Sequence, residues 1–308
     1  MMTKPKTGLL LVLAVCSSVT GLNAGEFEST FRKEVSVFID SLDAAQRKAC
    51  LLDVSDQRRW RMQYTGGKRP GIEISRLNPV QRVALEKALR LVLSDHGWRM
   101  ANEVAGQDVR DGDDDVDGGG ALGKYWITCF GDPRQGDFAF RLAEHHLTIV
   151  QLELSEGEAS EFGPILLGSN PPTLWKEDER DLMEAWKLVA DEKILLKGKR
   201  AVASEPMNPD DGVAFASLND KAQKAFKDAW QRRLSIFKAP IRNRINKLHG
   251  QRGGWQKSRV AYYHEAPAKR CKDGGRWDFK CGLPGMVWDF ESSRGHIHMS
   301  LWVKGNKD

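Results

Sequence analysis

Cysteine is scarce in this sequence, and its spacing argues against two common kinds of site. The 308 residues include five cysteines, and no two of them form a Cys-x-x-Cys pair. That absence disfavours a zinc ribbon and a thioredoxin-type redox centre, because both need thiols at that spacing. A Gly-x-Ser-x-Gly motif is also missing, which disfavours the serine nucleophile of the α/β-hydrolases.

Long apolar runs are missing as well. After the N-terminus the longest are short stretches such as residues 165–167, far below the ~20 residues of a spanning helix. We therefore expect no transmembrane segment in the mature chain. A chain of this size can bury roughly 75% of its unfolded surface, so it needs neither a metal nor a disulfide in order to fold. Any bound metal would then serve chemistry.

The N-terminus has the order of a secretory signal peptide. Lys4 and Lys6 precede an apolar run over residues 8–15, and a polar stretch leads to Ala24 and Gly25. The apolar run is about half the length of a bilayer span, which is typical of a cleaved leader. We predict a signal peptide over residues 1–24, cleavage after Ala24, and an exported protein, periplasmic or secreted.

Export makes the remaining cysteines informative. Lipidation at Cys16 is the weaker alternative, because Val15 stands where a small residue is wanted. Without the leader an even number remains in an oxidising compartment, namely Cys50, Cys129, Cys271 and Cys281. Cys271 and Cys281 are the plausible local pair, with a loop of about ten residues. The alternative is that Cys50 and Cys129 are simply buried thiols.

Charge is uneven along the chain. Residues 221–272 hold 15 Lys or Arg against two acidic residues, a net of +13 that leaves −8 for the rest of the formal +5. Such a segment can form a basic face that binds an acidic polymer, and for an exported protein we do not expect nucleic acid. The alternative is an ordinary solvated surface that is partly neutralised by the acidic remainder.

The motif matches near residues 108–124 are incomplete: calcium binding is the weaker alternative for the acidic part, and the nucleotide-binding matches are rejected. Residues 113–118 copy the start of a calcium loop, but the twelfth position is Lys124 where a bidentate Glu is needed. The glycines of residues 118–123 match a nucleotide fingerprint, yet an acidic loop precedes them and a strand follows. We interpret this stretch as an acidic surface loop.

Helix caps and periodicity indicate an α+β fold, an antiparallel sheet with helical blocks packed on it. Three boxes, each a capping residue with Gln three positions later, predict helices that start at Asp43, Asn78 and Asp220. Further helices are expected near 28–40, 98–106 and 176–196, and strands at 125–130, 138–142, 145–154, 259–265, 284–290 and 296–303. Helices and strands thus come in blocks rather than in strict alternation. Residues 198–217 are expected to be a long connection.

The histidines carry the sharpest functional signal. His145-His146 begins one predicted strand, and His296-x-His298 begins another. In the second strand the period of two places the apolar residues 297, 299, 301 and 303 on the core face and both histidines on the other. Two imidazoles at i and i+2 can bind one divalent metal, and either His145 or His146 could supply a third ligand. Adjacent residues point to opposite faces, so only one of that pair is expected to join.

Other residues could complete this site. Glu144, Asp289 or Glu291 could add or tune a ligand, and Arg141 and Tyr125 could act as catalytic residues that orient substrate. The cofactor would be a divalent transition metal, Zn, Cu or Fe. The alternative is that a His-x-His pair merely faces water.

Several motifs together resemble one bacterial family, which is catalogued only as domain of unknown function 3500. They are Phe130-Gly131-x-Pro133, His145-His146-Leu147, Pro164-x-Leu166-x-Gly168-x-x-Pro171, Tyr262-Tyr263 and His296-x-His298. The resemblance spans roughly residues 30–303. It implies a single domain over residues 25–308 and marks both histidine clusters as family features, but it supplies no reaction. The sequence departs from the family pattern at Glu144, Val287 and Gly295.

Two functions from different classes follow. One is an exported metal-dependent enzyme, a hydrolase or oxidoreductase that acts on a small-molecule substrate, with an ion held by histidines. The other is a non-catalytic envelope or extracellular binding protein. It would bind an acidic polymer through residues 221–272 and through tryptophans such as Trp255 and Trp277. The sequence chooses neither the metal, the substrate nor the oligomeric state.

Overall fold

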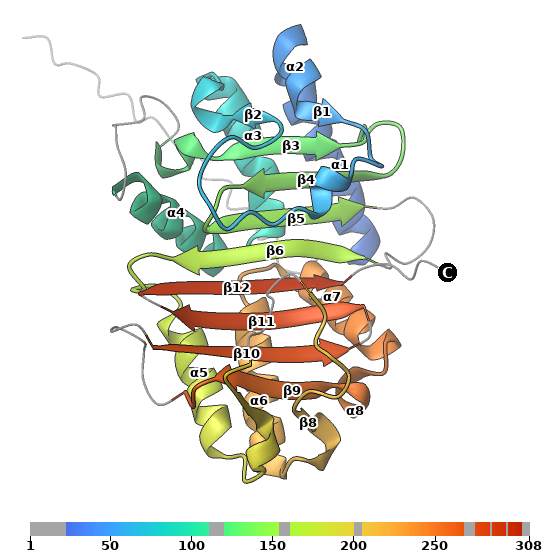
Figure 1. The fold of residues 1–308 in the computed structure, drawn as a ribbon. Coiled ribbons are helices and arrows are strands. Elements are labelled where there is room, and N and C mark those ends of the chain that lie inside the picture. Colours follow the sequence, from blue (N-terminus) through green and yellow to red (C-terminus); the bar gives the residue numbers. More distant parts are fainter. Residues whose placement is uncertain are drawn as a thin grey trace, which may run out of the picture.

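One mostly antiparallel sheet runs through the molecule, as the computed structural model shows (Figure 1). The structure describes residues 23–110, 120–153, 161–199, 205–267, 275–283, 285–293 and 295–303. In these ranges twelve strands lie in the order β1 (Leu51–Leu52), β3 (Trp126–Phe130), β4 (Phe138–Ala143), β5 (Leu147–Glu153), β6 (Phe162–Ser169), β12 (His296–Val303), β11 (Met286–Ser293), β10 (Arg276–Leu283), β9 (Arg259–His264) and β7 (Leu195–Lys197), with β2 (Ile72–Glu73) on β3 and β8 (Val213–Ala214) on β9. Only the β1–β3 and β7–β9 pairs are parallel among them.

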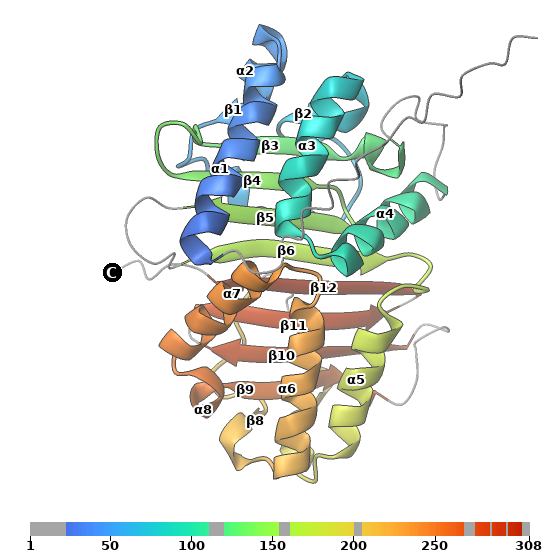
Figure 2. The same cartoon turned by 180° about the vertical axis from the view of Figure 1, so that it is seen from behind.

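The long helices cover one face of this sheet (Figure 2). They are α1 (Ala24–Ser41), α3 (Pro79–Val92), α4 (Asp95–Arg110), α5 (Lys176–Lys187), α6 (Asp220–Leu234) and α7 (Ala239–Gln251), while α2 (Ala44–Cys50) and α8 (Gly254–Lys257) are short. Their apolar stripes pack against alternate strand residues, such as Phe140 of β4 and Met299 of β12, in one large core. The predicted α+β class, a sheet with helical blocks packed on it, is confirmed.

The helix starts follow the predicted cap chemistry with one exception. The boxes Asp43/Gln46 and Asn78/Gln81 are formed in both directions. For α6 the predicted cap at Asp220 is wrong by one residue, because Asn219 accepts the hydrogen bond from the Ala222 amide. A cap of this kind contributes about 1 kcal/mol.

Some predicted elements differ from the observed ones. The helix expected over residues 176–196 ends at Lys187, and residues 195–197 instead pair with β9 as β7. The strand expected at 284–290 is β11, Met286–Ser293. Strands β6 and β10 and helix α7 were not predicted. All eight residues of β6 are buried, so its two faces show no alternation that a sequence pattern could detect.

The second half of the chain has the same arrangement of strands as the first half. Strands β3 to β6 and strands β9 to β12 each form a four-stranded antiparallel run, flanked by one parallel and one antiparallel short strand. Gly71 and Gly212 begin the equivalent segments, with φ of +104° and +61°. A Cβ at either glycine would lie about 2 Å from a backbone oxygen of the neighbouring strand, 2.0 Å at Ile127 and 2.1 Å at Val260, so both sites need glycine.

The two halves meet around an approximate twofold axis. The central strands β6 and β12 pair antiparallel. On the helical side a bridge joins Leu93 to Phe237, and its hydrogen bonds are reciprocal: the Ser94 amide donates to the Ile236 oxygen at 2.8 Å, and the Lys238 amide to the Val92 oxygen at 3.0 Å. The candidate site described below lies beside this junction.

Two segments of chain cross the face that the long helices leave uncovered (Figure 1). We call residues 53–71 the first strap and residues 205–212 the second strap. The first is held by the Thr128 hydroxyl, which donates to the Pro70 oxygen at 2.6 Å. The second accepts a hydrogen bond from the Lys280 ammonium at the Glu205 oxygen, also at 2.6 Å. The polar side chains of the strands are therefore largely buried beneath protein.

Several sequence predictions concern residues outside the described ranges. The signal peptide falls on residues 1–22 almost entirely, so export and the cleavage site stay predictions. Cys16, Cys271 and most of the acidic loop, residues 111–119, also lie outside the described residues. Cys50, Cys129 and Cys281 are free and buried. No helix in the described ranges combines the length and the apolar character that a membrane span requires.

Candidate metal centre

Histidines from the two halves of the chain converge at one end of the sheet. His145 and His146 occupy the turn between β4 and β5, and His296 and His298 begin β12. The ring centre of His146 lies 5.9 Å from that of His296 and 5.6 Å from that of His298, and the latter two are 5.8 Å apart. Because β12 pairs with β6 and the Gly168 amide of β6 donates to the His146 oxygen at 2.7 Å, the fold brings both predicted clusters together.

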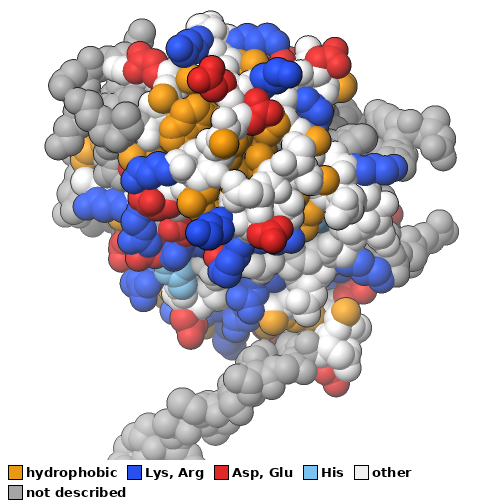
Figure 3. Space-filling model, turned by 90° about the horizontal axis from the view of Figure 1, so that it is seen from below, with side chains coloured by type: hydrophobic (Ala, Val, Ile, Leu, Met, Phe, Trp, Pro, Cys, Tyr) orange, Lys and Arg blue, Asp and Glu red, His pale blue; other side chains and the backbone are white. Residues whose placement is uncertain are grey.

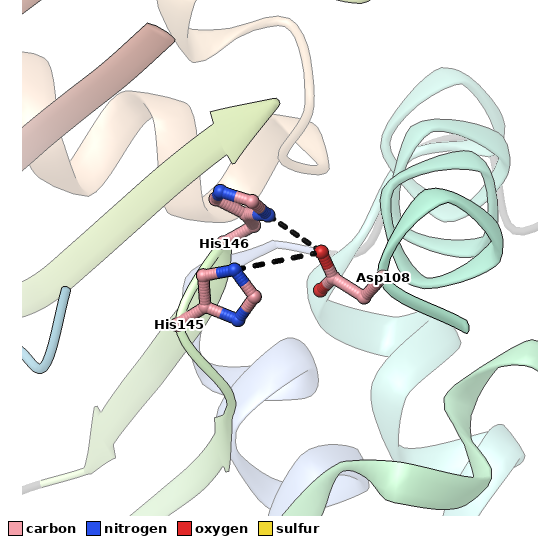
Figure 4. Close-up of side chains that lie close together, drawn as sticks. All are labelled: Asp108, His145 and His146. Carbon is pink, nitrogen blue, oxygen red and sulfur yellow. Dashed lines mark hydrogen bonds and ion pairs between the residues drawn. The ribbon is translucent and has the colours of Figure 1, made fainter. Parts of the chain in front are cut away.

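Asp108, near the end of α4, points at the two adjacent histidines (Figure 4). Its Oδ1 lies 2.5 Å from His146 Nδ1 and 3.9 Å from His145 Nε2. Its Oδ2 accepts a hydrogen bond from the Tyr125 hydroxyl at 2.5 Å. One ligand atom from each of Asp108, His145 and His146 lies within 4.8 Å of the others, so this cluster could hold a metal ion.

Two buried imidazole nitrogens near Asp108 have no hydrogen-bond partner in the described part of the chain. They are the Nε2 atoms of His146, which is 1% exposed, and of His298. Leaving such an atom unsatisfied costs about 1–3 kcal/mol. Gly168 makes room for both rings, because a Cβ there would lie 2.6 Å from His146 Cδ2 and 3.0 Å from His298 Cδ2. The rings of His146 and His298 therefore lie side by side next to Gly168, and each has an Nε2 atom that is available to bind a metal.

The protonation of these histidines differs with their surroundings. Burial lowers the pKa of His298 to about 4, and Glu291 only partly opposes this, so its ring is neutral at pH 7. Burial also acts to lower the pKa of His145, but the carboxylates of Glu144 and Asp108 outweigh it and the pKa is raised. A neutral imidazole is the form that binds a metal.

The three carboxylates proposed from the sequence occupy different places. Glu144 lies 3.5 Å from His145 Nδ1 and forms a buried ion pair with Arg69 at 2.8 Å. Glu291 stands directly opposite His298 on β11. Asp289 pairs with Ser300 instead, whose amide donates to it at 2.9 Å. Glu144 and Glu291 thus flank the histidines.

Tyr64 and Asp108 were missed by sequence reasoning. Tyr64, on the first strap, sets its ring perpendicular to that of His298 with 5.4 Å between centres. Nothing local in the sequence places this strap residue over β12. Asp108 did leave a signal, because it follows the buried Val104 and Ala105 at helical spacing and so lies on the inner face of α4.

Arg141 and Tyr125 are close to the centre, but their polar groups contact protein. The buried Arg141 guanidinium donates to the backbone oxygens of Arg58 at 3.3 Å and Arg61 at 2.7 Å, which holds down the first strap. The Tyr125 hydroxyl is bound to Asp108. Tyr125 can therefore influence His146 through that carboxylate.

The basic segment over residues 221–272 is partly neutralised by acids outside it. Arg232 pairs with Glu177 at 2.6 Å, Arg233 with Asp178 at 3.0 Å, and Arg244 with Glu153 at 2.9 Å. The side of the molecule seen in Figure 3 shows Lys and Arg intermingled with Asp and Glu rather than a patch of one sign. These contacts match the sequence-based alternative of a partly neutralised surface.

Asp289 makes stability depend on pH. Burial raises its pKa to about 7, and Lys280, 3.9 Å away, only partly offsets this, while Asp278 adds to it. Between the ordinary pKa of 3.8 and 7 the native state holds a proton that the unfolded state has lost. The contribution of this carboxyl to stability is therefore full below pH 4 and is lost as the pH rises to 7.

We expect Asp289→Asn to flatten that dependence. The fall in unfolding free energy between pH 5 and pH 7 should be smaller by about 2 kcal/mol, since one proton corresponds to about 1.4 kcal/mol per pH unit. Urea denaturation at the two pH values measures it. Asp210→Asn removes an exposed carboxylate as the control and should keep the wild-type slope. Equal slopes for D289N and wild type would contradict the assignment.

One comparison with known proteins gives a family. The model of a family described as "Protein of unknown function (DUF3500)" matches residues 25–193, which confirms the resemblance seen in the sequence. No curated protein and no solved structure matches the chain.

Proposed function

Because this chain belongs to the DUF3500 family, whose description names no reaction, we propose from its own side chains that it is a metal-dependent enzyme, a hydrolase or an oxidoreductase. The observation that carries the proposal is the pair of buried, unpartnered Nε2 atoms of His146 and His298. A divalent ion bound to both would satisfy them together. A chain of this size needs no ion to fold, so such a site would be kept for chemistry.

Asp108 supports the same proposal. A histidine that binds a metal through one nitrogen usually donates its other N–H to a carboxylate, which fixes the ring and its tautomer. Asp108 holds His146 Nδ1 in this way at 2.5 Å and leaves Nε2 as the ligand atom. We therefore propose that Asp108 orients His146 and is not itself a direct ligand of the ion.

We assign His296 as the third ligand. The three ring centres of His146, His296 and His298 form a nearly equilateral triangle with sides of 5.9, 5.6 and 5.8 Å. Its centre is about 3.3 Å from each ring centre, close to the sum of a 2.0–2.1 Å metal–nitrogen bond and the ~1.1 Å from a nitrogen to its ring centre. Rotation of the rings would direct their nitrogens to this point.

The remaining groups would act around the ion. A bound divalent metal supplies an activated water or an oxygen-binding position at neutral pH. Glu291, opposite His298, would accept a proton there, and Tyr64 would shield the rings from bulk water. Zn would restrict the site to hydrolysis, because of the three metals only Cu and Fe exchange electrons.

Metal analysis of protein purified without a histidine tag tests the proposal. We expect about one equivalent of a transition metal per chain, lost in the double variant His146→Ala/His298→Ala with an unchanged circular dichroism spectrum. His96→Ala is the matched control, since His96 lies outside the cluster and contacts Arg99. Wild-type protein that takes up no Zn, Cu or Fe, or a double variant that keeps it, would refute the proposal.

The same sample tests the second candidate, the binding of an acidic polymer. Metal-free protein with salt-sensitive affinity for a polyanion would favour it, although the ion pairs of Arg232, Arg233 and Arg244 neutralise part of the charge that it needs. Export remains part of our proposal on the N-terminal sequence alone. Sequencing of the mature protein should then begin at Gly25.

A further inference from the structure

Three arginines gather beside the metal centre, where the first strap crosses β4. Arg69 is 3% exposed and Arg141 is 1% exposed, whereas Arg61 lies at the surface. The Arg61 backbone oxygen accepts the 2.7 Å hydrogen bond from Arg141. The positive charges of Arg61 and Arg69 add to the burial that lowers the pKa of Arg141 to about 10.

This arginine cluster, Arg61, Arg69 and Arg141, carries more positive charge than its surroundings neutralise. Among the described residues Glu144 is the carboxylate that pairs with it, through Arg69. Arg141 binds only carbonyl oxygens, and the Nε atoms of both Arg69 and Arg141 are buried without a partner. A buried charge without a counter-charge costs several kcal/mol, which a bound anion would offset.

The cluster borders the histidines directly. The Gly67 amide and Arg69 both bind the carboxylate of Glu144, at 3.0 and 2.8 Å, and that carboxylate lies 3.5 Å from His145 Nδ1. The strap residues that cross here, 65–68, are exposed and end in Lys68. A Cβ at Gly66 would lie 3.9 Å from His145 Nδ1, so bare glycine backbone of this exposed stretch borders that ring.

We propose that the arginine cluster binds an anionic group of the substrate, a carboxylate, a sulfate or a phosphate, next to the histidine centre. Guanidinium groups bind these planar or tetrahedral oxyanions through paired N–H donors. The inference rests on the proposed function for the reaction, but the binding of the anion does not need the metal. It gives the substrate class as acids.

Titration with simple anions tests this inference. Sodium sulfate, phosphate and acetate are added at constant ionic strength, balanced by sodium chloride, and binding is measured by calorimetry. We expect millimolar binding of at least one of them, weakened at least tenfold by Arg61→Ala. Arg58→Ala removes an equal charge from the same strap, where Arg58 pairs with Asp56, and should bind as wild type does. The anion that binds best identifies the group.

The outcomes separate this inference from the proposed function. If no anion bound more tightly than chloride, or if R61A and R58A weakened anion binding equally, the arginine cluster would not be a specific anion-binding site. Arg141→Lys is a second variant that keeps the charge and loses the forked donors, and it should also weaken binding. Each titration is run on chelator-treated and on metal-supplied protein. Anion binding without metal uptake would sustain the inference and refute the enzyme, and metal uptake without anion binding would do the reverse.

Discussion

Gly97→Ala should lower the free energy of unfolding by about 3 kcal/mol or more, because the structure leaves no room for the added methyl group. Gly97 lies on α4, where the two halves of the chain meet. A Cβ there would be 2.0 Å from the Ile236 oxygen and 2.8 Å from the Ile236 carbonyl carbon. These are backbone atoms of a segment held by reciprocal hydrogen bonds, so they cannot move aside cheaply.

Gly106, on the same helix, provides the matched control. A Cβ at Gly106 meets nothing within 4 Å. Alanine has the higher helix propensity, so Gly106→Ala should raise the unfolding free energy by about 0.5–1 kcal/mol. Thermal and urea unfolding of the two variants measures the difference. If both changed stability in the same direction and by similar amounts, the close contact at Gly97 would not be what limits the site.

Asp108→Asn should reduce metal affinity by about 10- to 100-fold, the usual effect of losing a carboxylate that orients a metal-bound histidine. The amide cannot accept hydrogen bonds at both positions where Asp108 now accepts them, from His146 Nδ1 and from the Tyr125 hydroxyl. His146 would then favour the tautomer that carries its proton on Nε2, the proposed ligand atom. Competition with a chromogenic chelator gives the affinity.

Tyr125→Phe is the companion of that variant. It removes one hydrogen bond to Asp108 but leaves the carboxylate on His146, so we expect a loss of less than tenfold. D108N with wild-type affinity would show that Asp108 neither orients a ligand nor acts as one. Complete loss of metal in D108N, with His146→Ala less affected, would instead make Asp108 a direct ligand.

Local chemistry made much of the fold predictable. The cap boxes located α2 and α3, strand-like runs located β4 and β5, and the alternation of apolar residues located β12. The prediction failed where neighbours in space decide the structure. Strand β6 is buried on both faces because β5 and β12 flank it and a strap and helices cover it, so its sequence shows no alternation.

The candidate site, like the fold, was only partly predictable from the sequence. The four histidines were found because they come as two close pairs beside predicted strand starts. In β12 a period of two also ranks the face on which His296 and His298 lie, whereas His145 and His146 lie in the turn before β5. Their approach to one another depends on the pairing of β6 with β12, which joins residues far apart in the chain. Asp108 acts on a histidine 38 positions away, and Tyr64 reaches His298 from a strap without regular structure. No short-range pattern predicts such contacts.

The twofold likeness of the two halves ends at this site. Where Tyr125 lies before β3, Ser258 lies before β9, and both backbone oxygens accept the equivalent hydrogen bond, from Ile74 and from Phe215. Where His146 closes the β4–β5 turn, Gly285 closes the turn between β10 and β11. In a dimer of two identical protomers joined in this manner, every substitution would be present twice, so two such sites would form. A single polypeptide can specialise one end for chemistry and keep the other as scaffold, which limits the expected stoichiometry to one ion per chain.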